Sequence, residues 1–414
     1  MLKDNLITGL DIGSTAIRIV VGERPKNESK IRIIGAVEGP SKGISKGVVV
    51  DPDDAISAIS AVLEKAERMV GQAVGHAWVG INGSHIITSE SRGVIAVSKV
   101  NGEIREADVE RVVENAKSVS APPNYEILHV IPKSFTVDSQ VGIKDPVGMT
   151  GIRLEVETQI IQGLTAQIKN LTNCVYRTGL EIDDLVLSIL ATAESVLTNR
   201  QKDLGVVVIN VGGRTTSLAV FEEGDLLHTA VIPIGSDHIT NDINLLFRIS
   251  IDTADKIKVR EGSCMAKEFK RHDEMKFAAV GGIEEGYFSK KQVAEVIEAR
   301  VEEIFTYVDK ELKKINKAGR LPAGAVITGG GAKLDGIIEV AKRVLHLPAT
   351  IGYPHDLVSS LDRVSDPAFT TAVGLTLWGN QLMNKSGSRG SSGGVNIVES
   401  ALSGIKNIFK SLLP

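Results

Sequence analysis

The sequence predicts an α/β protein made of two similar halves around a cleft, with a small inserted α+β subdomain and a C-terminal amphipathic helix. Three observations lead to this fold class. The chain has 414 residues, more than one hydrophobic core usually organises. Strand and helix patterns alternate along most of it. The segments "LDIGSTAIRIVVGE" (10–23) and "INVGGRTTSLAVFEEG" (209–224) share one order of strand, glycine turn, hydroxyl residues and strand, which indicates an internal duplication.

The first half begins with strands at "LITGLDIG", "AIRIVVGE" and "KIRIIGAVE". A helix is expected next, with Asp51 as its N-cap, Pro52 at its first position and Gly71 at its end. The face turned to the sheet is expected to be Ile56, Ile59, Val62, Leu63, Ala66, Met69 and Val70. "AWVGING" is predicted to be the following strand.

A change of pattern marks an insertion at 84–162. There "HIITSESRGVIAVS" and "EILHVIPKSFTVD" predict strands of an open sheet, with the helix "READVERVVENAKSV" between them. The alternation resumes at "LTAQIKNLTNCVYRTGL". We therefore expect the first half to comprise 1–83 and 163–198.

The second half is expected at 199–383. Strands are predicted at "VVVINVGG", "TTSLAVFEEG" and "LLHTAVIPIG", with helices around 239–247 and 253–259. A long helix should begin near Lys290, because Ser289 stands three residues before Gln292, the spacing of a capping box. It should stop at Gly319, before Pro322.

The C-terminal stretch carries a separate signal. "NKSGSRGSSGG" (384–394) has the composition of a flexible linker. In the segment 395–414, residues at helical spacing form one apolar face, namely Val398, Ala401, Leu402, Ile405, Ile408, Phe409, Leu412 and Leu413. A helix docked in a core seldom follows so flexible a tether. Contact with a membrane surface is therefore favoured over a protein groove or disorder, through Val398, Leu402, Ile405, Ile408, Phe409 and Leu412.

Composition limits the function classes. With 43% hydrophobic and 24% charged residues, the chain has the composition of a globular protein. A formal net charge of −4 gives no broad basic surface, so no nucleic-acid partner is expected. Cys174 and Cys264 lack His partners at metal-ligand spacing and indicate buried thiols in a reducing compartment. No run approaches the ~18 apolar residues of a spanning helix, so the body is expected to be cytosolic.

The two similar segments predict a phosphate site. Glycine lets backbone N–H groups come close to phosphate oxygens, and two such hairpins facing each other would clamp a nucleotide. A third glycine loop, "VITGGGAKLDG" (326–336), follows the long helix. Turn glycines are common, so one hairpin alone would be weak evidence.

The order of these motifs resembles the actin, sugar-kinase and heat-shock ATPase superfamily, and more closely the bacterial FtsA family. The resemblance covers residues 1 to about 382. It rests on "GLDIGST", "VVVINVGGRTTSLAVF", "TADKIKVREG", "TGGGAKLDG" and "SDPAFTTAVGL". It implies duplicated actin-like (ribonuclease H-like) domains around a nucleotide cleft, with ATP and Mg as cofactors. The insertion falls where that family carries its characteristic subdomain.

The resemblance also implies roles for matching residues. Asp11 would orient magnesium through water. The phosphates would be held by Gly13, Ser14, Thr15, Gly212, Gly213, Thr215 and Thr216. The adenosine would be approached by Asp255, Lys258, Gly329, Gly330 and Gly331. For Asp255 and Lys258, a solvated charged helix face is the alternative.

The second phosphate motif departs from the family pattern. Asn210 stands in place of an aspartate, Arg214 in place of a third glycine and Ser217 in place of an acid. Arg214 would either bring a cation near phosphate or point to solvent. Glu194 is only a weak candidate for the glutamate that actin-like ATPases use near the γ-phosphate. Because phosphoryl transfer depends on charge placed around magnesium, we expect ATP binding with weak or absent ATPase activity.

The resemblance implies a membrane tether in cell division that anchors the FtsZ ring and recruits later division proteins. The implied partners are the FtsZ C-terminal peptide, further copies of the chain in a filament, later division membrane proteins and the lipid bilayer surface. The implied place is the cytoplasmic side of the cell membrane at the division site. A PilM-like pilus-assembly adaptor and a small-molecule kinase of the same superfamily are the alternatives.

Overall fold

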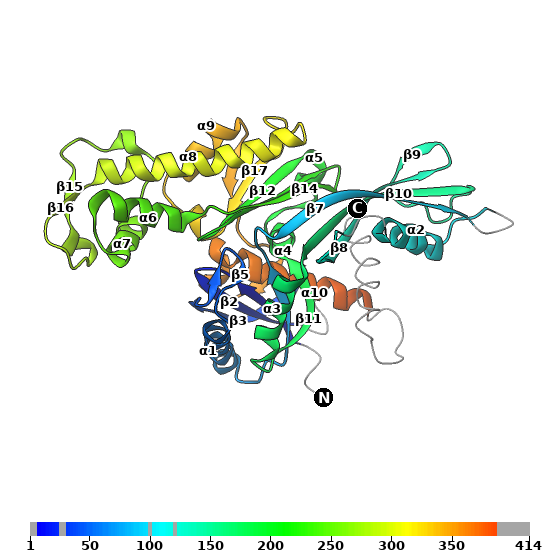
Figure 1. Cartoon of the computed structure of the whole chain (residues 1–414), viewed down its shortest axis with the longest axis horizontal. Coiled ribbons are helices and arrows are strands. Elements are labelled where there is room, and N and C mark those ends of the chain that lie inside the picture. Colours follow the sequence, from blue (N-terminus) through cyan, green and yellow to red (C-terminus); the bar gives the residue numbers. More distant parts are fainter. Residues whose placement is uncertain (1–5, 25–29, 98–101, 119–121, 387–414) are drawn as a thin grey trace.

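The computed structural model describes residues 6–24, 30–97, 102–118 and 122–386. Each half is built on its own sheet, and the inserted subdomain extends away from them (Figure 1). The first sheet has the order β11-β6-β1-β2-β3-β19. Its strands are β1 (Leu6–Ile12), β2 (Ala16–Glu23), β3 (Ile31–Pro40), β6 (His76–Ile81), β11 (Glu181–Leu187) and β19 (Leu357–Ser359). A short hairpin of β4 (Ile44–Ser45) and β5 (Val48–Val49) lies beside it.

The second sheet repeats the centre of the first. Its order is β14-β13-β12-β17-β18, with β12 (Val206–Val211), β13 (Thr216–Glu222), β14 (Asp225–Ile232), β17 (Gly324–Thr328) and β18 (Ala349–Ile351). In both sheets the first strand pairs antiparallel with its hairpin partner and parallel with a later strand. Asp11 pairs with Arg18 and Asn210 pairs with Ser217, so the two motifs occupy equivalent registers. The predicted duplication is therefore confirmed.

Helix α1 (Pro52–Val70) follows its predicted caps. The Asp51 carboxylate accepts from the backbone N–H groups of Asp53 and Asp54, and Gly71 adopts a left-handed φ of 77°. The buried face includes Ile59, Val62, Leu63 and Ala66. Met69 lies at the margin of this face: it is 48% exposed, but its sulfur accepts from the Ala36 backbone N–H of β3 at 3.4 Å.

The second half carries helices α6 (Ser236–Phe247), α7 (Ile251–Glu261), α8 (Lys290–Lys314) and α9 (Ile337–Leu345), with a hairpin of β15 (Glu274–Lys276) and β16 (Tyr287–Ser289). Ser289 caps α8 as predicted, by accepting from the Gln292 backbone N–H. The predicted end at Gly319 was wrong. The helix stops at Lys314 because Asn316 takes a left-handed φ of 56°.

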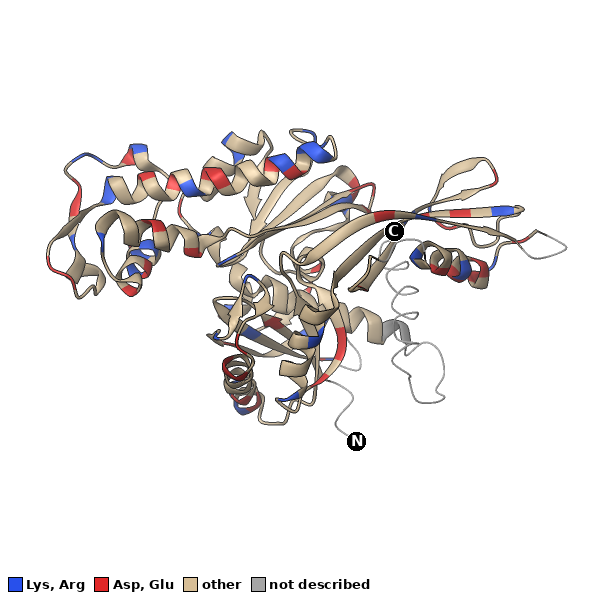
Figure 2. Cartoon of the chain, viewed as in Figure 1, with Lys and Arg blue, Asp and Glu red and all other residues tan. Residues whose placement is uncertain are grey.

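Charges of both signs alternate along α8 (Figure 2). Some of them hold the neighbouring helices in place. Arg300 of α8 pairs with Asp242 of α6 at 2.7 Å, and Arg343 of α9 pairs with Glu298 of α8 at 2.7 Å. These ion pairs hold α6 and α9 against one long helix.

The inserted subdomain is a four-stranded antiparallel sheet of order β7-β10-β8-β9 that packs against one helix. Its elements are β7 (Ile86–Ala96), α2 (Glu106–Ser118), β8 (Tyr125–Val137), β9 (Gln140–Ile143) and β10 (Arg153–Leu164). It also contacts β14 of the second half: Thr88 and Thr229 hydroxyls lie 2.7 Å apart, and Gln159 donates to the Leu227 carbonyl. Lys144 forms an ion pair with Asp225.

Helices α4 (Ser188–Val196) and α10 (Thr370–Ser386) cross each other between the halves. The chain enters the second half from β10 through α3 (Thr165–Tyr176), β11, α4 and α5 (Asn199–Leu204), and it returns to the first sheet through α10. The α4–α10 crossing is very close, because a Cβ added at Gly374 would overlap the backbone carbonyl of Ala191. Gly9 of β1 meets the Ala372 carbonyl in the same way.

Helix α10 includes 384–386, so the first residues of the predicted linker are helical. The rest of that linker, with the predicted amphipathic helix and its membrane-contacting residues, lies outside the described residues. Across 6–24, 30–97, 102–118 and 122–386, no helix is long and apolar enough to cross a membrane. Cys174 and Cys264 are both buried and free, as predicted.

Candidate nucleotide site

A cleft of about 450 Å³ lies between the two halves. The structure brings together there nearly every residue that the motifs predicted. Those that line it are Asp11, Gly13, Ser14, Thr15, Asn210, Gly212, Gly213, Thr215, Asp255, Lys258, Gly329, Gly330 and Gly331. They lie on β1, β12, α7 and the glycine loops. These elements meet because the hairpin turns of the two sheets face each other across the cleft.

Two predicted residues do not line the cleft. Thr216 is fully buried, and its hydroxyl donates to the Ile234 carbonyl at 2.8 Å. It begins β13, where successive side chains point to opposite faces, so Thr215 and Thr216 cannot both face the cleft. Glu194 also lies elsewhere, because Lys202 holds its carboxylate at 2.6 Å. It is therefore not the glutamate near the phosphates.

The two hairpins are built alike. The Gly13 N–H donates to the Ala16 carbonyl at 3.1 Å, and the Gly212 N–H donates to the Thr215 carbonyl at 2.9 Å. The turns touch across the cleft: a Cβ at Gly213 would overlap the Thr15 hydroxyl. Only glycine permits this approach, and residues of both turns line the cleft.

Asp11 is the carboxylate at the base of the first hairpin. Burial raises its pKa from the ordinary value of 3.8 to about 6, and the positive charge of Arg18 opposes that rise. Arg18 is itself engaged, since its Nε donates to Glu38 at 3.0 Å. The Asp11 charge is thus poorly compensated in the protein alone, which suits a carboxylate that faces a hydrated cation.

Asn210 occupies the equivalent position in the second half. Its amide nitrogen donates to the hydroxyls of Thr192 at 3.3 Å and Thr371 at 3.0 Å. These hydroxyls belong to the crossing helices α4 and α10 and lie 2.9 Å from each other. The Asn210 amide therefore joins β12, the first strand of the second hairpin, to both α4 and α10.

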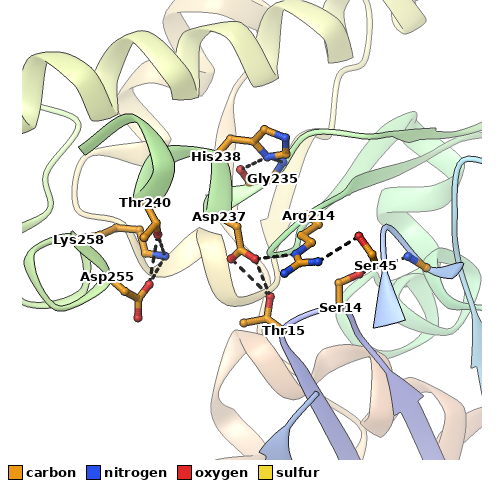
Figure 3. Close-up of polar contacts among 11 residues, drawn as sticks. Ser14, Thr15, Ser45, Arg214, Gly235, Asp237, His238, Thr240, Asp255 and Lys258 are labelled. Atoms are coloured by element: carbon orange, nitrogen blue, oxygen red, sulfur yellow. Dashed lines mark hydrogen bonds and ion pairs between the residues drawn. The ribbon is translucent and has the colours of Figure 1, made fainter. Parts of the chain in front are cut away.

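The remaining side of the cleft is formed by α7 and the loop 329–331. The Lys258 ammonium lies 2.7 Å from Asp255 and donates to the Thr240 hydroxyl at 2.7 Å (Figure 3). Gly329 has a φ of 88°, and a side chain there would overlap the Asn210 amide. Because Gly329 has no side chain, the loop 329–331 can pack against β12.

Helix α7 is fixed at its start by Glu284, and the contact gives a pH prediction. Thr253 Oγ1 donates to the Glu284 carboxylate at 2.6 Å and the Ser250 N–H donates at 2.7 Å. These bonds lower the pKa of Glu284 from 4.5 to about 2. A carboxyl whose pKa is lowered in the folded state stabilises the fold at pH values above its pKa in the unfolded chain. For Glu284 this contribution is lost as pH falls from about 4.5 to about 2.

The free energy of unfolding of the parent should therefore exceed that of Glu284→Gln at pH 7, and the difference should vanish near pH 2. Chemical denaturation at several pH values measures it. Glu285→Gln, a change at the adjacent exposed carboxylate, is the control and should stay within about 0.5 kcal/mol of the parent at pH 7. A Glu284→Gln deficit that does not depend on pH would contradict this account.

Several residues that line the cleft were not predicted. They include Asn82, whose amide bridges the Thr215 and Ser217 hydroxyls at 3.3 and 3.1 Å, and Asp237 at the start of α6. A weak signal for Asp237 was present in "IPIGSDHIT", where a strand, a glycine and an acid precede a helix. Arg214, for which the sequence left two alternatives, also lines the cleft. Its guanidinium is paired with Asp237, so this side chain does not simply point to solvent.

Two similar sheets with facing hairpins across a cleft define the actin-like class of proteins. The solved PilM-PilN type IV pilus biogenesis complex has a TM-score of 0.67 at 15% identity, over 90% of this chain and 98% of that chain. MreB5 of Spiroplasma citri bound to ADP has a TM-score of 0.54 at 14% identity, over 94% and 99%. At these identities the likeness concerns the fold alone.

Sequence relatives identify the family within that class. The family model of cell division protein FtsA matches residues 207–374, and that of the SHS2 domain inserted in FtsA matches 83–162. FtsA of Pseudomonas aeruginosa is 37% identical over 91% of this chain and 89% of that protein. FtsA of Bacillus subtilis is 39% identical over 91% and 83%. The chain belongs to the FtsA family of cell division proteins. The resemblance stated from the motifs is confirmed, and the PilM likeness is one of fold.

Proposed function

We propose that this cell division protein is a membrane tether that binds ATP in the cleft and anchors the FtsZ ring to the inner face of the cytoplasmic membrane. Family membership supports the division role. The amphipathic segment 395–414, placed after a glycine- and serine-rich linker, is the observation that carries the tether. The facing glycine turns support the nucleotide, since both line one cleft and turns of this kind can bind phosphate through backbone N–H groups.

Magnesium fits the donors of the cleft. It keeps most of its waters and uses one or two carboxylates together with phosphate oxygens. Asp11 offers such a carboxylate, while Asn210 offers only a neutral amide, whose nitrogen donates to Thr192 and Thr371. When bound with ATP, magnesium would neutralise phosphate charge. Because the second acid is missing, we infer that ATP acts as a structural ligand that closes the cleft and is hydrolysed slowly or not at all.

The partners follow from the same proposal. The protein would bind the FtsZ C-terminal peptide and recruit later division membrane proteins, from a peripheral position at the division site. It would also assemble head to tail through the insertion 84–162 and the second half, because heterologous contacts that do not close give open filaments. A filament presents many tails, so individually weak lipid contacts would combine into stable attachment.

Co-sedimentation with liposomes tests the tether. A chain lacking 395–414 should stay in the supernatant, while the full chain sediments with vesicles. Phe409→Glu places a charge in the middle of the apolar face, so we expect it to reduce the affinity for lipid, measured over a range of lipid concentrations, at least about tenfold, since burying an aromatic side chain contributes roughly 1.5 to 3 kcal/mol. Asn407→Glu adds the same charge on the polar face and is the matched control.

The control variant should sediment nearly as well as the parent. ATP affinity should be the same in all these proteins, because the substitutions lie outside the body. If Phe409→Glu sediments like the parent, the helix does not anchor the protein, and a protein groove becomes the better site for it.

A further inference from the structure

The cations that line the cleft share one property. Each of them is paired with a carboxylate that lines the same cleft: Arg18 with Glu38, Arg214 with Asp237, Lys258 with Asp255 and Lys333 with Asp366. A polyphosphate entering the cleft therefore meets cations that are already neutralised. To use one of them, it must displace the carboxylate that holds it.

The pair of Arg214 and Asp237 differs from the others in its position. Arg214 lies in the turn of the second hairpin, and its Nε donates to Asp237 Oδ2 at 3.3 Å. Its Nη1 donates to the Ser45 hydroxyl at 3.0 Å, so the guanidinium reaches across the cleft to the first half (Figure 3). It is the one charge pair of the four that contacts hairpin residues of both halves.

Asp237 receives donors from both hairpins. The Thr15 hydroxyl of the first hairpin lies 3.5 Å from Asp237 Oδ1 and 3.4 Å from Oδ2, the oxygen that also accepts from Arg214 (Figure 3). Its backbone N–H donates to the Gly213 carbonyl at 2.7 Å, which fixes the start of α6 against the second hairpin. A carboxylate with two acceptor oxygens is thus held between the two turns that the proposed function assigns to phosphates.

Carboxylate and phosphate are recognised by the same donors. A guanidinium binds either one through charge-assisted hydrogen bonds, and a threonine hydroxyl donates to either. The Asp237 side chain therefore occupies donors that a phosphate oxygen would use. It also repels a phosphate that approaches without displacing it, because two anions a few ångströms apart repel in a partly enclosed cleft.

We propose that Asp237 stands in for the terminal phosphate of the nucleotide in the ligand-free protein, and that Arg214 is the side chain that distinguishes a nucleoside triphosphate from a diphosphate. This inference rests on the proposed function, since it assumes that adenine nucleotide binds in this cleft. On binding ATP, Arg214 and Thr15 exchange Asp237 for the terminal phosphate. ADP lacks that phosphate and leaves the Arg214–Asp237 pair in place.

Calorimetric titration of the full-length protein with ATP and with ADP, each with and without Mg²⁺, tests the proposal. Asp237→Asn keeps the shape but removes the competing charge, so it should tighten ATP binding about tenfold and change ADP binding much less. Arg214→Gln should weaken ATP binding about tenfold or more, and should bring the ATP and ADP affinities close together.

Lys333→Gln is the matched control. Lys333 is a cation that lines the same cleft and pairs with Asp366 at 2.7 Å, but it makes no contact with the hairpins among the interactions of the described residues. Its substitution should change ATP and ADP affinities by similar factors. The thermal unfolding midpoint of each variant shows whether it is folded before titration.

Three outcomes would overturn the proposal. If both Arg214→Gln and Asp237→Asn leave the ratio of ATP to ADP affinity unchanged, these residues do not distinguish the triphosphate from the diphosphate. Weaker ATP binding by Asp237→Asn only when Mg²⁺ is present would make Asp237 a metal-holding residue instead. A parent protein that binds neither nucleotide would overturn the proposed function together with this inference, whereas the first two outcomes leave the nucleotide site standing.

Discussion

Replacing Gly374 by valine is expected to lower the free energy of unfolding by about 3 kcal/mol or more, because overpacking a close contact typically costs 1 to 3 kcal/mol and here the obstacle is backbone. A Cβ at Gly374 would overlap the carbonyl group of Ala191, and its distance to the Ala191 Cα would be 3.2 Å. The backbone of a buried helix cannot move aside as the end of a side chain can. The two crossing helices must therefore separate.

Gly374→Ala is the stricter test, because helix propensity and the overlap change the free energy of unfolding in opposite directions. Alanine is favoured over glycine inside a helix by about 1 kcal/mol, so an open position would be stabilised by the change. At Gly374 the overlap should outweigh that gain and destabilise the protein. Urea denaturation measures both variants. Gly75→Ala is the control, since a Cβ there meets nothing within 4 Å.

This crossing also bears on the cleft. Helices α4 and α10 carry Thr192 and Thr371, which hold the Asn210 amide. Separating the helices should therefore weaken nucleotide binding even in molecules that remain folded. If Gly374→Ala is as stable as the parent or more so, the helices adjust freely, and the crossing is not the rigid joint between the halves.

The local elements were predictable because their signals are local. Asp51, Pro52 and Gly71 define α1 through contacts within a few residues of the chain. The duplication was predictable for a different reason: both hairpins need glycine at the turn, and the two turns make the same backbone bond. The glycine pattern therefore had to appear twice in the sequence.

The errors arose where the deciding contact is distant or subtle. Glu194 was considered for the phosphates, but Lys202 on the next helix binds it instead. Asp237 was missed because one of its partners, Thr15, lies 222 residues away, and no local pattern announces that contact. The end of α8 depends on the left-handed backbone of Asn316, whereas the glycine farther on was the stronger sequence signal. Strand alternation alone could have shown that Thr215 and Thr216 do not both face the cleft.

Asp11→Asn is expected to weaken binding of ATP in the presence of Mg²⁺ by about 10- to 100-fold, the usual effect of losing a group that orients the waters of a bound metal ion. Binding of ATP without Mg²⁺ should change little or become tighter, since a negative charge has been removed. Phosphate release, which we expect to be slow in the parent, should not rise. Glu23→Gln is the control, because Glu23 is an exposed carboxylate at the end of β2 and does not line the cleft.

The same substitution should stabilise the ligand-free protein. Burial raises the pKa of Asp11 from 3.8 to about 6, so at pH 7 the fold must hold a charge that the unfolded chain holds more easily. For an acid with a raised folded-state pKa, stability falls as pH rises between about 4 and 6 and stays lower above that window. Asparagine carries no such charge, so Asp11→Asn should gain on the order of 2 kcal/mol at pH 7 and little at pH 4.

A variant that is more stable without ligand yet binds Mg·ATP less well separates a binding role from a structural one. Loss of a merely structural carboxylate would lower stability and affinity together. Urea denaturation at pH 4 and pH 7, combined with titration of ATP with and without Mg²⁺, gives both quantities on one protein. If Asp11→Asn binds Mg·ATP as tightly as the parent, the metal is oriented from elsewhere in the cleft. The poorly compensated charge of Asp11 would then need another explanation.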